Sequence, residues 1–399
     1  MNFNENEKTM YEHEDPYEKR INKGNIVFLC LVVCFCLIIG VGGIMNLLSK
    51  DREFSESENR VLASFPKLTI SSIADGSFMK GFETYMADQF VFRDRIISMK
   101  TYCDRLTGKR EENGVYIGEN GFLIEKQSAY SKKKVKALTS SINAFMKKYP
   151  YIEKMVAISP NASYIYADKL PKGIEMHNQF TELTAIMKSL KGENYTFLNV
   201  SKALDSVTDK HQVFYKTDHH WTTRGAYATF RVLTDKWGLK RSAVKYQFLT
   251  VSSEFEGTLA SKTGIHDIQD KVEICVPKNS KGSYVVTYES ADRKTASLFE
   301  PEKIQQKNKY EVFLGGNYDK VVIDTVSSSK NTLLIIKDSY ANCMIPMLTP
   351  YFTRIVVVDP RYMTESIHTV MDEYNFTHAL FLYNLNTFLE DTSLEDALK

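Results

Sequence analysis

An uncharged, strongly apolar run occupies residues 26–48, close to the start of the chain. A helix of this length can cross the hydrocarbon core of a bilayer, which is about 30 Å thick. The run exceeds the apolar core of a cleaved signal peptide, and no A-x-A-like site follows it. Lys19, Arg20 and Lys23 flank it, which favours a cytoplasmic N-terminus. The pattern predicts a single-pass anchor in the cell membrane, preceded by a disordered polar tail at 1–25.

A helical repeat of apolar residues follows the anchor and predicts an extracytoplasmic stalk at 49–108. The same segment contains a few polar groups in a partly apolar setting, which we interpret as structural pairs. These polar residues are Asn59, Arg60, Asp88 and Arg93, and the apolar stripe contains Phe78, Phe82, Tyr85, Met86, Phe90, Phe92 and Ile96.

Beyond residue 108 the periodicity alternates between helical and extended segments, which predicts an α/β domain at 109–399 with a doubly wound, mainly parallel sheet. A stretch at about 240–310 interrupts the alternation with short β-like runs, and we expect it to be an inserted β-rich lobe. Helices are predicted at 131–149, 180–190 and after Trp221, and strands at 154–159, 195–200, 333–336, 355–358 and 379–383.

Composition is that of an ordinary globular protein, with 43% hydrophobic and 25% charged residues. The formal net charge of +2 gives no reason to expect nucleic-acid binding. Three of the six cysteines lie in the apolar run, and Cys103, Cys275 and Cys343 are scattered. This distribution predicts neither a disulfide framework nor a zinc site.

Two motifs could supply an acid, a base and a nucleophile. Asp218 stands two positions before His220, so both side chains project from one side of an extended segment and the carboxylate can orient the imidazole. Much later, an apolar strand runs directly into Asp338-Ser339-Tyr340, which would expose the Ser339 hydroxyl at a strand-to-helix turn. We predict that Asp218, His220 and Ser339 form a catalytic triad, with the Ser339 hydroxyl about 2.6–3.2 Å from a His220 nitrogen.

Further polar residues stand at the carboxyl ends of the last strands, where ligands of open α/β sheets bind. The backbone N–H of Tyr340 and the side chain of Asn384 are the expected oxyanion donors. Arg361, which follows Asp359 and Pro360, is a candidate substrate-binding residue, although a structural ion pair is the favoured interpretation. Trp221 is a second candidate for substrate binding, by stacking on a sugar ring, with core packing as its alternative.

Taken together, Asp218-His219-His220-Trp221, Asp338-Ser339-Tyr340 and Glu58-Asn59-Arg60 resemble the bacterial DHHW proteins. The resemblance spans most of the chain after the anchor. These proteins resemble the SGNH (GDSL-like) hydrolase superfamily, and in particular its alginate O-acetyltransferase branch, in which the Asp-x-His element precedes the serine. This sequence departs from the usual motifs of the superfamily at two places. The glycine of the usual Gly-Asp-Ser motif is Lys337, and the usual Gly-x-Asn-Asp reads Tyr383-Asn384-Leu385-Asn386.

The resemblance implies an SGNH-like fold in which Ser339 is the nucleophile, His220 its base, Asp218 the orienting acid and Asn384 the oxyanion asparagine. It further implies a serine-dependent O-acetyltransferase or acetylesterase that acts on a cell-surface or exported polysaccharide through an acyl-serine. A membrane partner that exports acetyl groups would be the donor. No cofactor and no metal is expected.

Three alternatives remain at this point. Asp-His-His also occurs in metal phosphoesterases of the DHH type, but the other histidines are scattered without ligand spacing. A second alternative is a glycan-binding or assembly protein that kept the fold and lost the chemistry. The third is a structural or secretion-associated protein with a different fold. His219 has no assigned role, because it alternates away from its neighbours and is expected in packing or at the surface.

Overall fold

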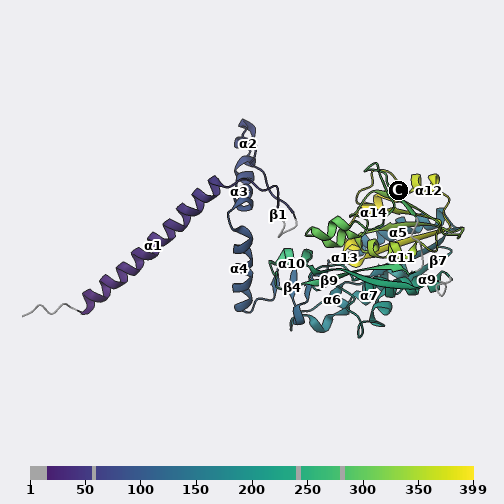
Figure 1. The fold of residues 1–399 in the computed structure, drawn as a ribbon, viewed down its shortest axis with the longest axis horizontal. Helices are drawn as coiled ribbons and strands as arrows, with labels where there is room; N and C mark the ends of the chain where they lie inside the picture. Colours follow the sequence, from purple (N-terminus) through teal and green to yellow (C-terminus); the bar gives the residue numbers. More distant parts are fainter. Residues whose placement is uncertain (1–15, 56–59, 240–243, 279–283) are drawn as a thin grey trace, which may run out of the picture. The chain divides into compact units, whose positions relative to one another are not determined.

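The computed structural model describes residues 16–55, 60–239, 244–278 and 284–399 (Figure 1). The chain divides into two compact units, of which the first comprises residues up to 55 together with 60–96 and the second residues 97–399. Glu58 and Asn59 of the expected motif, and most of the expected N-terminal tail, lie outside the described residues. The division into tail, anchor, stalk and α/β domain therefore stays a prediction.

The first unit begins with the long helix α1 (Pro16–Leu48). Its stretch Gly24–Leu48 contains 18 consecutive residues with a mean hydropathy of 3.0, and it is long and apolar enough to cross a membrane. The expected apolar helix is thus present. It begins earlier than expected, within the segment assigned to a disordered tail, because Pro16 suits a first helical turn and the residues after it are good helix formers.

The rest of this unit is held by a buried carboxylate and an aromatic cluster. Asp88 accepts hydrogen bonds from the Arg60 guanidinium at 2.9 and 2.5 Å and from the Ala63 N–H at 2.8 Å. The hydrogen bond from Arg60 lowers the pKa of Asp88 to about 2. Phe65 packs its ring edge-on against residues of the expected apolar stripe. The elements are β1 (Phe54–Ser55), β2 (Arg60–Val61), α2 (Ile70–Ala74), α3 (Ser77–Gln89) and α4 (Arg93–Leu106), of which α4 continues into the second unit.

The second unit is built on an eight-stranded sheet in the order β11-β10-β12-β14-β13-β15-β6-β7. The strands from β14 to β7 are parallel, and β12, β10 and β11 extend this sheet in antiparallel fashion. The predicted mainly parallel sheet is therefore confirmed. Its strands are β6 (Glu153–Ser159), β7 (Tyr195–Leu198), β10 (Tyr284–Tyr288), β11 (Arg293–Thr295), β12 (Lys320–Thr325), β13 (Thr332–Lys337), β14 (Arg354–Val358) and β15 (His378–Asn384).

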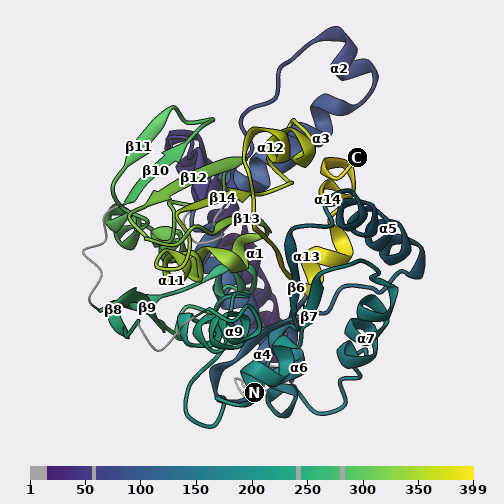
Figure 2. The same cartoon turned by 90° about the vertical axis from the view of Figure 1, so that its right-hand side faces the viewer.

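Helices cover both faces of this sheet, which explains the continuous apolar runs of its strands. In β13, Leu333 and Ile335 face one core, and Leu334 and Ile336 face the other. Helices α5 and α7 pack on one face and α9 on the other (Figure 2). The described α-helices of the unit that follow α4 are α5 (Lys132–Lys148), α6 (Ala162–Ile165), α7 (Gln179–Ser189), α8 (Val200–Asp205), α9 (Thr223–Lys236), α10 (Thr258–Thr263), α11 (Ile345–Leu348), α12 (Ile367–Glu373), α13 (Leu385–Glu390) and α14 (Ser393–Ala397).

The expected inserted lobe divides into two parts. Strands β8 (Tyr246–Phe255) and β9 (Asp270–Pro277) pair only with each other among the described strands, with α10 between them. Strands β10 and β11 instead join the central sheet, because the edge of β12 is open to antiparallel pairing and β10 contributes Val286 and Tyr288 to the core. The second half of the insertion therefore enlarges the sheet instead of forming a separate lobe.

A small antiparallel sheet precedes α5 and later contributes to the surroundings of the site. It contains β3 (Glu111–Glu112), β4 (Val115–Ile117) and β5 (Leu123–Glu125). Asn113 and Gly114 connect β3 to β4 with φ of 51° and 76°, as a two-residue hairpin turn requires.

Candidate active site

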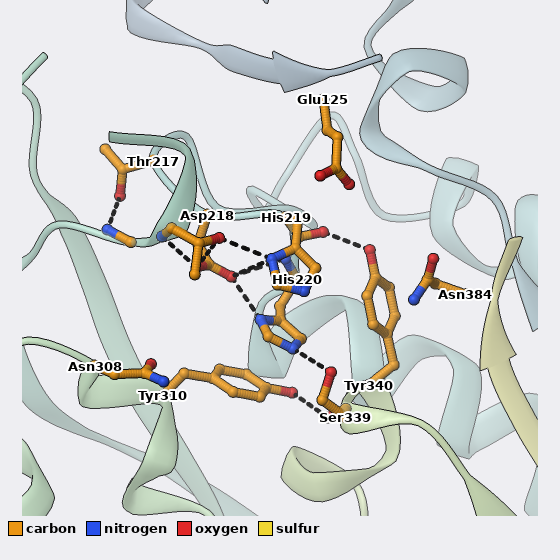
Figure 3. Close-up of polar contacts among 12 residues, drawn as sticks. Glu125, Thr217, Asp218, His219, His220, Asn308, Tyr310, Ser339, Tyr340 and Asn384 are labelled. Atoms are coloured by element: carbon orange, nitrogen blue, oxygen red, sulfur yellow. Dashed lines mark hydrogen bonds and ion pairs between the residues drawn. The ribbon is translucent and has the colours of Figure 1, made fainter. Parts of the chain in front are cut away.

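The turn that carries Ser339 follows β13 directly, because β13 ends at Lys337 and the next residue, Asp338, already caps a helix. Asp338 is the N-cap of a short 3₁₀ helix, Ser339–Cys343, and its side chain accepts a hydrogen bond from the Tyr340 N–H at 2.9 Å. This cap bends the chain directly after the strand and turns the Ser339 hydroxyl toward His220. The Ser339 Oγ lies 2.7 Å from His220 Nε2, within the predicted range (Figure 3).

The histidine belongs to a loop whose two arms are hydrogen-bonded to each other. Phe214 and Trp221 form a β-bridge, and the Tyr215 N–H donates to the His220 carbonyl at 3.2 Å. Asp218 Oδ1 accepts from the His220 backbone N–H at 2.9 Å and from His220 Nδ1 at 2.5 Å. Because Nδ1 donates to the carboxylate, Nε2 of the neutral ring is free to accept the Ser339 proton.

The second oxygen of Asp218 is held by Thr258, the first residue of α10. Asp218 Oδ2 accepts from the Thr258 N–H at 2.8 Å and from its hydroxyl at 3.0 Å. This approach requires a glycine at position 257, because a Cβ there would lie 2.2 Å from Asp218 Cβ and 2.5 Å from Oδ2. Gly257 and Thr258 could not be predicted from the sequence, since no motif connects them with the distant Asp218.

Charge and burial set the protonation states that general-base chemistry needs. Burial raises the pKa of Asp218, but the neighbouring histidines and the hydrogen bonds from His220 and Thr258 outweigh it and hold this pKa well below its usual range. Burial and the adjacent His219 lower the pKa of His220 to about 4, against the opposing effect of Asp218. At neutral pH the carboxylate is therefore ionised and the imidazole is neutral.

Tyr310, which sequence analysis also missed, covers the face of the His220 ring. The two rings stack with centroids 3.8 Å apart and an interplanar angle of 13°. The Tyr310 hydroxyl donates to the Ser339 carbonyl at 3.1 Å, so one buried side chain contacts both His220 and the turn that carries Ser339. Tyr310 lies at the end of the predicted insertion, where the sequence carries no recognisable signal.

The two expected oxyanion donors are engaged by Asp338. The Tyr340 N–H donates to Asp338 Oδ1, and the Asn384 amide donates to Asp338 Oδ2 at 2.6 Å and to Thr387 Oγ1 at 2.7 Å. In this structure neither group is free to act as the predicted oxyanion donor, because each N–H already has an acceptor. Among the described residues, no hydrogen-bond acceptor faces the Ser339 backbone N–H, which makes it the available donor for an oxyanion.

Lys337, which replaces the family glycine, is fully buried and belongs to an ionic cluster behind the nucleophile. Its ammonium donates to Asn317 Oδ1 at 2.6 Å and to Asp359 Oδ2 at 3.1 Å. Asp359 also binds the Arg361 guanidinium through two donors, at 2.9 and 2.7 Å. Arg361 thus forms the structural ion pair considered above, and Asn317 is a second partner of Lys337.

Trp221 does not face solvent. Its ring is fully buried and its Nε1–H donates to the Tyr340 carbonyl at 2.8 Å. No face of the ring is open to a sugar, so the substrate-binding role predicted for Trp221 is wrong and its packing alternative is correct. The Cys343 thiol is also buried, and burial raises its pKa to about 12, which argues against a second nucleophile.

Asp218, His219 and His220 form the only group of three potential metal ligands found close together among the described residues. The atoms of Asp218 and His220 are already committed, since Asp218 accepts from His220 and Thr258 and His220 Nε2 faces Ser339. This arrangement fits a proton relay better than the several free ligands of a metal phosphoesterase.

Residues 118–315 match the family model of the SGNH hydrolase-like domain of the acetyltransferase AlgX. The chain carries an SGNH hydrolase-like domain. The matched part of this SGNH domain includes Asp218 and His220 and ends before Ser339. The predicted family resemblance is confirmed, while the catalytic roles of the three residues remain to be proposed.

Two solved structures are similar to this SGNH domain in fold. A DHHW family protein from Eubacterium siraeum is 22% identical, with a TM-score of 0.60 over 71% of this chain and 95% of that chain. Bacillus cereus PatB1 is 17% identical, with a TM-score of 0.59 over 70% of this chain and 97% of that chain. None of the curated proteins matches this chain in sequence.

Proposed function

We propose that this protein is a membrane-anchored serine O-acetyltransferase that modifies a polysaccharide through an acetyl-Ser339 intermediate. The observation that carries the proposal is the continuous hydrogen-bond chain from Asp218 through His220 to Ser339, with Nδ1 of the imidazole bound to the carboxylate and Nε2 2.7 Å from the hydroxyl. The similarity to the acetyltransferase AlgX domain supports acetyl as the transferred group.

Acylation uses His220 as base and then as acid. The Ser339 oxygen attacks the acetyl carbonyl while His220 Nε2 takes the hydroxyl proton, and Asp218 stabilises the imidazolium that forms. The bond between the carbonyl carbon and the donor oxygen then breaks, and His220 returns its proton to the leaving oxygen. The Ser339 N–H stabilises the oxyanion, a contribution of roughly 3–4 kcal/mol for one donor in comparable sites.

Deacylation repeats these steps with a hydroxyl group of the acceptor. His220 takes the proton of that hydroxyl, the new ester bond forms and the Ser339 oxygen leaves with the proton from His220. If water replaces the acceptor, the same steps give an acetylesterase. The balance between the two outcomes depends on how well the acceptor binds beside Ser339.

The anchor supports a location at the cell surface. The apolar stretch Gly24–Leu48 is long enough to span a membrane, and the basic residues before it favour a cytoplasmic N-terminus and an extracytoplasmic SGNH domain. A membrane partner that exports acetyl groups would then supply the donor, and an exported or cell-surface polysaccharide would be the acceptor.

Ester turnover by the full-length protein in detergent tests this proposal. The wild type should release p-nitrophenol from p-nitrophenyl acetate, whereas Ser339→Ala should reduce release to background and Ser253→Ala, at an exposed position of β8, should not. The solved PatB1 structure contains a sulfonyl adduct. By the same chemistry, a sulfonyl fluoride should label the wild type and leave Ser339→Ala unlabelled.

A second candidate is a glycan-binding protein that has lost catalysis. The observation that favours it is the engagement of the Tyr340 N–H and the Asn384 amide by Asp338, which leaves the Ser339 N–H as the available oxyanion donor. Absence of p-nitrophenol release and of sulfonyl labelling in a folded wild type would favour this candidate.

A further inference from the structure

A polar cavity of about 550 Å³ lies beside the hydrogen-bonded triad. It is lined by the turn between β3 and β4, the end of β5, α10 and the corner between β15 and α13. The cavity reaches both sides of the triad, since its wall contains Thr258, which binds Asp218, and Asn384, which binds Asp338. The cavity therefore lies beside the triad, although Ser339 is not among its lining residues.

The charges in the cavity wall balance. Glu125 and Glu390 contribute two carboxylates, and Lys126 and Lys262 contribute two ammonium groups. Glu125 Oε1 and Lys262 Nζ neutralise each other directly at 2.7 Å. Asparagine and glutamine amides make up much of the remaining polar wall. A wall of this kind offers many hydrogen bonds to hydroxyl groups and no net attraction for a polyanion.

His219 also lines this cavity, and its hydrogen bond to Thr258 decides which ring nitrogen carries the proton when the imidazole is neutral. The Asp218 carboxylate is ionised and can only accept, so the Thr258 hydroxyl donates its single proton to Asp218 Oδ2. The Thr258 oxygen must then accept the hydrogen bond at 2.9 Å that joins it to His219 Nδ1. The proton therefore resides on Nδ1 of His219, and Nε2 is an acceptor.

The position of His219 couples this acceptor to the triad. The His219 ring lies against the His220 ring with centroids 3.9 Å apart, and the His219 side chain is 29% exposed. Among the described residues, nothing donates a hydrogen bond to His219 Nε2. An unpaired acceptor at a polar cavity suits a ligand that brings its own O–H donor.

We propose that this cavity binds the acceptor of the acetyl group as a neutral, hydroxyl-rich saccharide, and that His219 Nε2 accepts a hydrogen bond from one of its hydroxyl groups. The proposal rests on the function proposed above and adds the chemical class of the acceptor. Uronate polymers fit this cavity less well, because its balanced wall offers their carboxylates no net positive charge.

Competition between acceptors tests the saccharide class. The full-length protein in detergent receives p-nitrophenyl acetate with either neutral tetrasaccharides (cellotetraose and chitotetraose) or anionic tetragalacturonate, and acetylated sugar is measured by mass spectrometry relative to p-nitrophenol. We expect the neutral tetrasaccharides to take at least about ten times more acetyl per p-nitrophenol released, equivalent to one hydrogen bond of about 1.4 kcal/mol. Equal or greater transfer to tetragalacturonate, or hydrolysis without transfer to either probe, would overturn the proposal.

Variants of His219 test the hydrogen bond itself. His219→Phe should lower the ratio of transfer to hydrolysis about tenfold, and His219→Gln, which keeps an acceptor, should restore most of it. This ratio compares two fates of the same acetyl-serine, so a merely structural effect on acylation would not change it. His211→Phe, at an exposed histidine outside the cavity, is the matched control. An unchanged ratio in His219→Phe would refute the role of His219, whereas absence of p-nitrophenol from the wild type would instead refute the proposed function.

Discussion

The two sides of the Ser339–His220 hydrogen bond use their polar groups differently. On the base side, both oxygens of Asp218 and both nitrogens of His220 have partners that fit general-base catalysis. On the nucleophile side, the donors that the family pattern assigns to the oxyanion instead bind Asp338. The base side thus has the hydrogen bonds that proton transfer requires, while in the proposed mechanism oxyanion stabilisation would depend on the Ser339 N–H.

The largest effect should come from breaking the base side at its carboxylate. Asp218→Asn removes the ion that stabilises the imidazolium and presents an amide that can favour the wrong tautomer of His220. We expect kcat/KM for p-nitrophenyl acetate to fall by roughly a thousandfold to ten-thousandfold. Asp209→Asn, at an exposed aspartate, should have no effect. A loss below tenfold in Asp218→Asn would mean that the carboxylate does not orient the base.

A methyl group behind Asp218 should have the next largest effect. In Gly257→Ala the added Cβ would overlap Asp218, so the carboxylate must move away from His220 or the β8–α10 loop must shift. We expect about a hundredfold loss of kcat/KM and a loss of roughly 1–3 kcal/mol in the free energy of unfolding, as for other overpacked sites. Urea unfolding followed by circular dichroism measures the second quantity. Unchanged activity and stability would show that this contact is not as close as described.

The pH profile tests the environment of His220. Burial and His219 lower its pKa to about 4, and protonation abolishes its function as a base. Accordingly, kcat/KM should stay near its plateau at pH 5.5 and decline as the pH falls through about 4. A histidine with an ordinary pKa of about 6.5 would already lose about tenfold at pH 5.5. Circular dichroism at each pH verifies that the protein stays folded, and a midpoint near 6.5 would contradict the account of the base side.

Asn384 distinguishes the two readings of the nucleophile side. Asn384→Ala removes the cap of α13 and a hydrogen bond to the buried Asp338 carboxylate, so we expect a loss of roughly 1–3 kcal/mol in the free energy of unfolding. Activity should fall less than about tenfold, because both amide hydrogens already have acceptors. Asn375→Ala, at an exposed position, is the control. If turnover instead fell about a hundredfold or more while KM stayed the same, Asn384 would be an oxyanion donor after all.

The smallest effect should come from the hydroxyl group of Tyr310. Tyr310→Phe keeps the ring stacked on His220 and removes the hydrogen bond to the Ser339 carbonyl. A hydrogen bond worth about 1 kcal/mol corresponds to a decrease of about fivefold in kcat/KM. Tyr362→Phe, at a half-exposed tyrosine, should leave turnover unchanged. An effect of Tyr310→Phe as large as that of Asp218→Asn would give this hydroxyl a direct part in the reaction.

The sequence predicted the parts of this molecule that depend on local pattern. The apolar runs of β13, β14 and β15 are typical of strands covered on both faces, and Asp-x-His together with a serine after a strand indicated the triad. The oxyanion side could not be predicted in the same way. Whether the Asn384 amide is free depends on Asp338, which comes from another strand and whose orientation follows from tertiary contacts.

Residues that support the base were missed for the same reason. Gly257 contacts Asp218 and Tyr310 contacts His220 across the fold, and neither residue belongs to a short motif. The sequence could not decide the role of Trp221, because an aromatic residue next to a site can either bind a ligand or pack in the core, and the structure buries it. The pairing of β10 with β12, which adds β10 and β11 to the central sheet, requires an open sheet edge, and periodicity along the chain does not reveal such an edge.

The most direct test of serine catalysis is to locate the acetyl group on the enzyme. The full-length protein is mixed with p-nitrophenyl acetate, quenched with acid during turnover and digested for peptide mass spectrometry. We expect an acetyl group on Ser339 in the wild type and no acetylated peptide from this region in Ser339→Ala. Turnover with the acetyl group on another residue, or turnover that persists in Ser339→Ala, would contradict the proposed mechanism.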